Sequence, residues 1–177
     1  GNSSTTLPGA LNTEKLLFEN NAKARRIIEV EGTCLDLSGS SLYCTPPSLC
    51  FRTELIELDL SCNPIKEYFT EEMTQLTNLQ ILNLRRCDLT NIPFALSKMN
   101  QLIKLDISEN NIGISYLGLT NLTNLEELNL KLTGITTIEN FESFIKLKVL
   151  DISKNNLRYN SISGIEDLIS LETLIMR

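Results

Sequence analysis

Five cysteines and a recurring aspartate are the residues of this sequence whose types could support chemistry. Three of the cysteines fall in "CLDLSGSSLYCTPPSLC", residues 34–50. Thiolates bind zinc, but a zinc site is disfavoured because the sequence holds no C-x-x-C pair and no histidine. Cys44 and Cys50 bracket a short loop. The remaining alternatives for this pair are a disulfide bond and two free thiols.

The redox state of Cys44 and Cys50 bears on where the protein resides. A disulfide forms in an oxidising compartment, so a bonded pair would favour a secreted protein. The odd count of five cysteines, with Cys62 and Cys87 inside the repeating pattern described below, favours free thiols. We therefore expect an intracellular protein, and a secreted one if Cys44 and Cys50 are bonded.

Catalytic chemistry finds little support in this chain. Histidine, the commonest general base and the usual partner of a serine or cysteine nucleophile, does not occur among the 177 residues. There is also no glycine-rich phosphate loop and no nucleophile elbow. Asp36, Asp59, Asp106 and Asp151 recur regularly rather than as an isolated acid pair. We expect a protein that is not an enzyme and that uses no cofactor and no metal ion.

Charge and hydropathy argue against two further classes of partner. The net charge is −6 and the basic residues form no long block, whereas nucleic-acid binding needs a concentrated basic face. No apolar run approaches the roughly 20 residues that cross a bilayer. We expect a protein partner, with no nucleic acid and no membrane insertion.

The aspartates belong to a sequence repeat with a spacing of 22 to 24 residues. Examples are "LIELDLSCNPI" at Leu55, "LIKLDISENNI" at Leu102 and "LKVLDISKNNL" at Leu147. The L-x-L alternation is a strand signal, in which the two leucines point inward and the residue between them points outward. The copies begin at Gly32, Leu55, Leu79, Leu102, Leu125, Leu147 and Leu171, and the last one stops at Arg177.

This pattern resembles the leucine-rich-repeat family, whose consensus is L-x-x-L-x-L-x-x-N/C-x-L. "GIEDLISLETL" is similar to the protein-phosphatase-regulator subtype, and "LTNIPFALSKMNQL" is similar to the I-P-x-x-L variant of bacterial and plant members, so the subtype is mixed. The resemblance implies an α/β solenoid, a curved right-handed superhelix. Its concave face would be a parallel β-sheet, and its convex side would carry short 3₁₀ or helical arcs.

The position written N/C in the consensus follows each strand. An amide there is expected to point inward, to bond the backbone of the turn, and to form a ladder through stacked copies. Cys87 fits the consensus, so we expect it in the core rather than as a reactive thiol. The position is occupied by Asn63, Asn110 and Asn155, with Ser40, Cys87 and Thr133 as variants.

The chain divides into three expected parts. Residues 1–11 form a flexible leader, residues 12–32 a helical cap over the first repeat, and residues 33–177 about seven repeats of which the last is incomplete. Asn12 or Thr13 would be the N-cap of the helix. Because the last copy stops within its L-x-L, we expect the parent chain to continue. The chain is expected to be a monomer unless this open edge pairs.

The register of the repeats predicts which side chains face outward from the concave sheet. The column between the two core positions is a stripe of acids and amides. Side chains on neighbouring strands stand about 5 Å apart, so the carboxylates repel mildly, and a basic partner segment would relieve this repulsion. A plainer interpretation is that these residues only keep the face soluble. The predicted partner-binding residues are Glu57, Asp59, Asn83, Arg85, Lys104, Asp106, Glu127, Asn129, Lys131 and Asp151.

Two functions follow from the sequence. The first is a non-catalytic protein–protein interaction module that binds a protein through its concave face. The alternative is the substrate-targeting repeat domain of a longer enzyme or pathogen effector whose catalytic part lies outside this chain.

Overall fold

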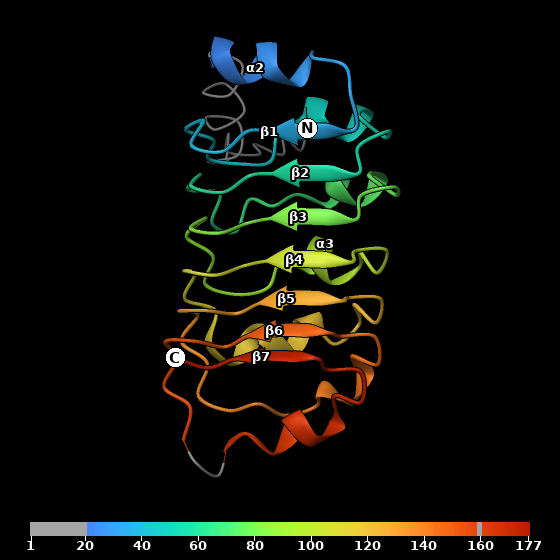
Figure 1. Ribbon diagram of the computed structural model, residues 1–177. Helices are drawn as coiled ribbons and strands as arrows, with labels where there is room; N and C mark the ends of the chain where they lie inside the picture. The colour runs from blue at the N-terminus through green and yellow to red at the C-terminus, as the bar shows by residue number, and fades with distance from the viewer. Residues whose placement is uncertain (1–20, 159–160) are drawn as a thin grey trace, which may run out of the picture.

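A computed structural model describes residues 21–158 and 161–177 of the chain. In these residues, seven parallel strands of three residues each form one sheet in sequence order. Figure 1 shows them stacked one below the other along the long axis of the molecule. The strands are β1 (Cys34–Asp36), β2 (Glu57–Asp59), β3 (Ile81–Asn83), β4 (Lys104–Asp106), β5 (Glu127–Asn129), β6 (Val149–Asp151) and β7 (Thr173–Ile175).

The strand register is the one that the leucine spacing predicts. Leu82 of β3 lies opposite Leu58 of β2 and Leu105 of β4. Leu105 is 2% exposed, whereas Lys104 and Asp106 on either side of it face outward. One continuous hydrophobic cluster runs through the described repeats behind the sheet. Burial of the leucines on one side of each strand therefore fixes which side chains the opposite side presents.

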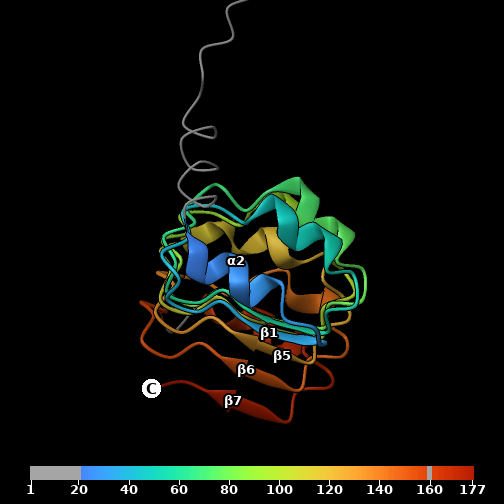
Figure 2. The same cartoon turned by 90° about the horizontal axis from the view of Figure 1, so that it is seen from above.

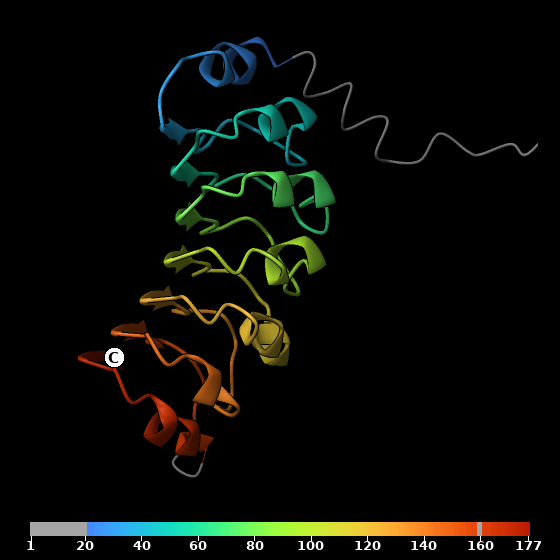
Figure 3. The same ribbon diagram turned by 90° about the vertical axis from the view of Figure 1, so that its right-hand side faces the viewer.

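Short helical pieces lie on the other side of the stack from the strands (Figure 3). Those in the described part of the chain are 3₁₀ except α3, as the three-residue spacing of their apolar residues predicts. The ring of Phe141 packs edge-on against Tyr116 and Phe144, with centroids 5.6 and 5.0 Å away. The solenoid fold is thus confirmed. The pieces are η1 (Pro47–Phe51), η2 (Glu71–Gln75), α3 (Phe94–Ser97), η3 (Gly113–Leu119), η4 (Phe141–Ser143) and η6 (Ser163–Asp167).

A helix, α2 (Ala22–Ile28), covers the end of the stack beside β1 (Figure 2). Its buried residues Ala24 and Ile28 belong to the same hydrophobic cluster as the repeats. Asn21 is its N-cap and accepts the backbone N–H of Ala24 at 3.0 Å. The expected leader, Asn12 and Thr13 lie outside the described residues. The division of the chain at residues 11 and 32 stays a prediction.

Inward-pointing amides join consecutive repeats. Oδ1 of Asn110 accepts the N–H groups of Cys87 and Leu89 at 2.9 and 3.0 Å. Its Nδ2 donates to the carbonyls of Leu84 and Ile107 at 2.8 and 2.9 Å. One side chain thereby satisfies backbone groups of two repeats, which confirms the predicted inward amide.

The ladder of such amides is interrupted at the positions that carry the variants Cys87 and Thr133. Asn63 and Asn155 make the corresponding bonds to the repeat before each of them. Cys87 donates to the carbonyls of Leu60 and Arg85, and Thr133 donates to the carbonyl of Leu130 and to Oδ1 of Asn155, but neither side chain accepts backbone N–H groups of the repeat before it as the amides do. The amides therefore join repeats in pairs instead of running through the whole stack.

None of the five cysteines, all of which lie in the described residues, forms a disulfide bond. Cys44 and Cys50 are buried, and Sγ of Cys50 donates to the carbonyl of Pro47 at 2.8 Å within η1. Cys87 is fully buried, and burial raises the pKa of its thiol to about 12. Cys87 is therefore a core residue, as predicted, while Cys34 and Cys62 are exposed.

Among the described residues, no helix combines the length and the apolar character that crossing a bilayer requires.

Candidate functional site

The outward face of the sheet, here called the concave face, presents one side chain per strand in each of three columns. The first column precedes the core leucine of each strand and the second follows it, as the strand register shows. The third column lies where the chain leaves the strands. The structure brings all ten predicted partner-binding residues onto this face: Glu57, Lys104 and Glu127 in the first column, Asp59, Asn83, Asp106, Asn129 and Asp151 in the second, and Arg85 and Lys131 in the third.

A shallow hollow of about 350 Å³ extends along the first two columns from β2 to β7. Its lining includes Ile81, Val149 and Ile175, which are half-buried although they face outward. The predicted set of residues omitted these three because it was restricted to polar side chains. Their apolar type at outward positions of the repeat is the signal that could have found them.

Each polar side chain of the second column bonds its own backbone. Oδ1 of Asp106 accepts the N–H of Ser108 at 2.8 Å, and Oδ1 of Asn129 accepts the N–H of Lys131 at 3.0 Å. This is an Asx turn, in which a short polar side chain ends a strand. The same bond occurs at Asp36, Asp59, Asn83 and Asp151. These side chains are therefore held in fixed positions on the face.

Amides separate most of the carboxylates of the second column. Nδ2 of Asn83 donates to Oδ2 of Asp59 at 3.0 Å, and Nδ2 of Asn129 donates to Oδ2 of Asp106 at 3.2 Å. The predicted stripe of acids and amides is present, but the expected repulsion between carboxylates on neighbouring strands is removed from β2 onward, because asparagine alternates with aspartate there. Adjacent carboxylates occur only at Asp36 and Asp59 among the described strands.

Cations collect in and beside the third column. Nη2 of Arg85 lies 2.5 Å from Oε1 of Glu109, and Nε of Arg86 lies 3.4 Å from Oε2 of the same carboxylate. The hydrogen bond from Arg85 lowers the pKa of Glu109 below its ordinary value of 4.5. Lys131 forms no ion pair with any described residue. It borders a polar hollow of about 280 Å³ together with Asp106 and Asp151.

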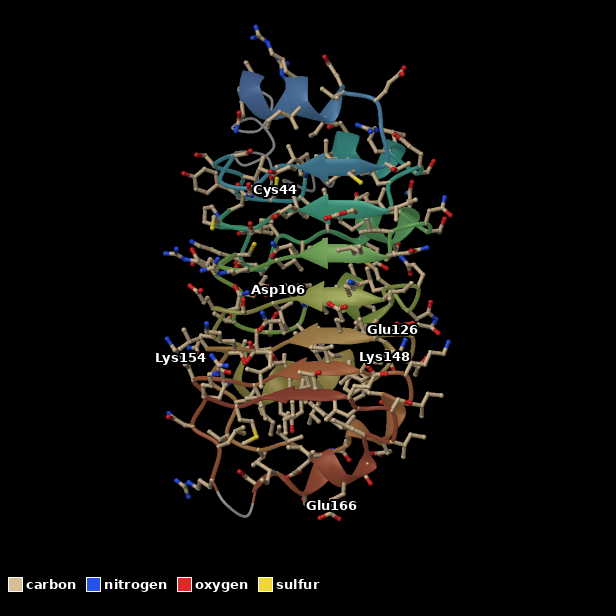
Figure 4. The ribbon with its side chains drawn as sticks, in the orientation of Figure 1. Cys44, Asp106, Glu126, Lys148, Lys154 and Glu166 are labelled. Atoms are coloured by element: carbon tan, nitrogen blue, oxygen red, sulfur yellow. The ribbon has the colours of Figure 1, made fainter. Side chains whose placement is uncertain are left out.

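On the side where the chain enters the strands, opposite charges pair across neighbouring repeats. Nζ of Lys104 lies 2.8 Å from Oε1 of Glu127, and Nζ of Lys148 lies 2.7 Å from Oε2 of Glu126. Figure 4 shows Lys148 and Glu126 at this edge, with Lys154 at the opposite edge and Asp106 between them. Exposed pairs of this kind contribute little to stability, so they leave the face mixed in charge rather than purely acidic.

Comparison with known proteins identifies the fold family. The family model described as Leucine Rich Repeat matches residues 78–99 and 146–168. The chain belongs to the leucine-rich-repeat family. Leucine-rich-repeat domains are commonly protein–protein interaction modules, and their fold is typically a non-catalytic scaffold.

Several leucine-rich-repeat proteins are similar to this chain. The protein flightless-1 homolog of Caenorhabditis elegans is 37% identical over 98 residues, which is 54% of this chain and 8% of that protein. A solved leucine-rich-repeat protein from Leptospira interrogans has a TM-score of 0.65 at 27% identity, over 87% of this chain and 45% of that one. The ectodomain of the plant receptor kinase GASSHO1/SCHENGEN3 from Arabidopsis thaliana has a TM-score of 0.62 at 26% identity, over 80% of this chain and 18% of that one. The chain therefore spans less than half the length of each of these relatives.

Proposed function

We propose that this chain is a non-catalytic interaction module that binds a protein partner through its concave face. The observation that carries the proposal is the fixed position of the outward polar groups. Asp59, Asn83, Asp106, Asn129 and Asp151 are all held by bonds to the backbone two residues on. A surface whose side chains are already ordered loses little conformational entropy when a partner binds.

The hollow on the same face supports this proposal. Ile81 and Val149 offer apolar surface next to fixed carboxylates and amides. Protein interfaces combine apolar contacts at the centre with polar groups around them. One of the similar structures, the GASSHO1/SCHENGEN3 ectodomain, was solved in complex with Casparian strip integrity factor 2.

Site-specific photo-crosslinking tests the proposal. A photoreactive amino acid replaces Ile81 on the concave face in one variant and Glu142, an exposed residue of η4 on the convex side, in the other. We expect the Ile81 variant to crosslink a protein in extracts of the source cells and the Glu142 variant to crosslink none. Crosslinking from Glu142 alone, or from neither position while the unmodified chain still retains its partner, would reject the concave face.

The alternative function is substrate targeting within a longer enzyme or effector. It is favoured by the length of two curated relatives, of which this chain covers only 8% and 4%. Under this proposal the concave face selects the protein on which another domain acts. Sequencing the parent reading frame decides between the two functions, because a frame that encodes no catalytic domain rejects the alternative.

A further inference from the structure

From β2 to β6, the outward residues in two of the three columns of the concave face alternate from strand to strand; Asp36 on β1 and Ile175 on β7 lie outside this alternation. Aspartate occupies the second column at Asp59, Asp106 and Asp151, on β2, β4 and β6, and asparagine occupies it on β3 and β5. The third column alternates in step. Repeats with aspartate carry buried Ser61, Ser108 and Ser153, and repeats with asparagine carry the cations Arg85 and Lys131. The aspartates of β2, β4 and β6 therefore alternate along the stack with the cations that follow β3 and β5.

The spacing of the carboxylates follows from this alternation. Neighbouring strands lie about 4.8 Å apart, so every second strand is about 9.6 Å away and three such carboxylates span about 19 Å. Each carboxylate accepts the N–H of its own turn at 2.8 or 2.9 Å. Asp59 also accepts the amide of Asn83, and Asp106 also accepts the amide of Asn129 and the hydroxyl of Ser108. The carboxylates of β2, β4 and β6 thus accept two, three and one bonds respectively. Because an ionised carboxylate has about four acceptor sites, each retains capacity for a further donor. The face thus holds three fixed acceptors at a regular spacing.

An extended polypeptide has a matching repeat. Polyproline II has three residues per turn and advances about 9.3 Å per turn, so side chains at every third residue point to the same side and cover about 19 Å in two steps. A β-strand does not match, because its side chains alternate between faces and those on one face lie about 6.8 Å apart. An α-helix returns to the same side after seven residues, or about 10.5 Å, and covers about 21 Å in two steps. The polyproline II form therefore fits the three carboxylates more closely than the α-helix does.

We propose that the partner lies along the stack as an extended segment with a Lys or Arg at every third residue, each paired with one of Asp59, Asp106 and Asp151. The proposal deepens the proposed function and rests on it. Ile81 lies on β3, between the strands of Asp59 and Asp106, and Val149 lies on β6 with Asp151; both line the same hollow and offer apolar surface beside the bound segment. The whole chain carries a net charge of −6, which favours association with a basic partner.

Synthetic peptides test this spacing directly. Two fluorescent peptides have one composition, a background of Ala and Pro with three Lys, placed at every third residue in one and at every second residue in the other. A third peptide is a helix former with Lys at every seventh residue. Fluorescence anisotropy measures their affinities. The measurement is made at about 0.15 M salt, because salt at this concentration screens the long-range charge attraction that does not depend on the lysine spacing. We expect the every-third peptide to bind at least about 10-fold more tightly than either of the others.

Asp106→Asn is the matched variant, because asparagine makes the same turn at Asn83 and Asn129. It should weaken the every-third peptide about 10-fold and remove its advantage over the every-second peptide. Glu142→Gln removes one carboxylate from the convex side and should change neither affinity. Equal effects of the two substitutions would mean that only net charge is sensed, and would overturn the proposal.

The remaining outcomes are equally decisive. Equal binding of the every-third and every-second peptides, tighter binding of the helical peptide, or no binding of any peptide overturns the spacing proposal. If crosslinking at Ile81 persists in those cases, the concave face remains the binding site and only the extended basic segment is rejected. If crosslinking at Ile81 also fails, the proposed function is rejected with it.

Discussion

Asn129 donates its side-chain N–H to Oδ2 of Asp106 across 3.2 Å, which joins the outward faces of β5 and β4. Both residues also accept an N–H from their own chain two residues on. The pair keeps a neutral amide beside a carboxylate on the neighbouring strand. Electrostatic repulsion on the concave face is thereby reduced without any partner.

Asn129→Asp should lower the free energy of unfolding by about 0.5–1 kcal/mol at neutral pH, because like charges directly opposite each other on neighbouring strands are destabilising. A carboxylate at this position stands beside both Asp106 and Asp151. Urea unfolding in low and high salt measures the effect, which should shrink as salt screens the charges. Asn121→Asp, at an exposed position after η3, is the control. Equal stability of Asn129→Asp and the wild type in low salt would contradict the prediction.

Glu109 should give the protein a defined pH dependence. Its pKa is lowered from the ordinary 4.5, chiefly by the hydrogen bond from Arg85. A lowered folded-state pKa contributes stability that is fully present above the unfolded pKa and is lost as pH falls through the folded pKa. The stability difference between the wild type and Glu109→Gln should therefore be largest above about pH 4.5 and should disappear at lower pH.

Thermal unfolding of the wild type and Glu109→Gln from pH 7 to pH 2.5 measures this difference. Because Arg85 is the main cause of the shift, Arg85→Gln should remove most of the same pH dependence. A difference between the wild type and Glu109→Gln that stayed constant over the whole pH range would reject the Arg85–Glu109 linkage.

Asn110→Ala should be among the most destabilising polar substitutions. The Asn110 side chain satisfies the N–H groups of Cys87 and Leu89 and the carbonyl of Leu84, all in buried surroundings. Leaving these groups unpaired should cost about 3 kcal/mol or more. Chemical denaturation compares it with Asn91→Ala, an exposed position that should change stability by less than about 0.5 kcal/mol. Similar stabilities of the two variants would mean that the amide does not hold the repeats together.

The five thiols should separate into distinct classes on alkylation of the native protein. Only the thiolate reacts, and burial raises the pKa of Cys87 to about 12. Cys34 and Cys62 are exposed and should be modified first at pH 8, while Cys87 should react only after unfolding. Mass spectrometry of peptides from timed samples follows each residue. Modification of Cys87 as fast as that of Cys62 in native protein would contradict its core position.

The repeat spacing alone predicts the fold and the placement of the outward residues. An L-x-L pattern at a constant interval determines which side chains must be buried, and stacking then aligns equivalent positions, as with Leu58, Leu82 and Leu105. Placement of Asp59 and Asp106 on one face follows without knowledge of any side-chain conformation.

The side-chain partners could not be predicted in the same way. Whether Arg85 reaches Glu109, or Asn129 reaches Asp106, depends on rotamers and on the distance between neighbouring strands. The state of Cys44 and Cys50 also depends on how the loop with Pro46 and Pro47 folds, which no spacing rule specifies. The alternation of aspartate and asparagine was visible in the sequence, but its meaning required the hydrogen bonds that link the strands.

Charge reversal on the concave face tests the binding function most directly. The double variant Asp59→Lys/Asp106→Lys should retain the folded solenoid by circular dichroism and weaken partner binding at least about 10-fold, because it places two cations where the face offers fixed carboxylates. Glu139→Lys/Glu142→Lys, at exposed positions around η4 on the convex side, changes the net charge equally and should leave binding unchanged. Partner binding that survives the Asp59 and Asp106 reversal undiminished would contradict the assignment of the concave face as the binding site.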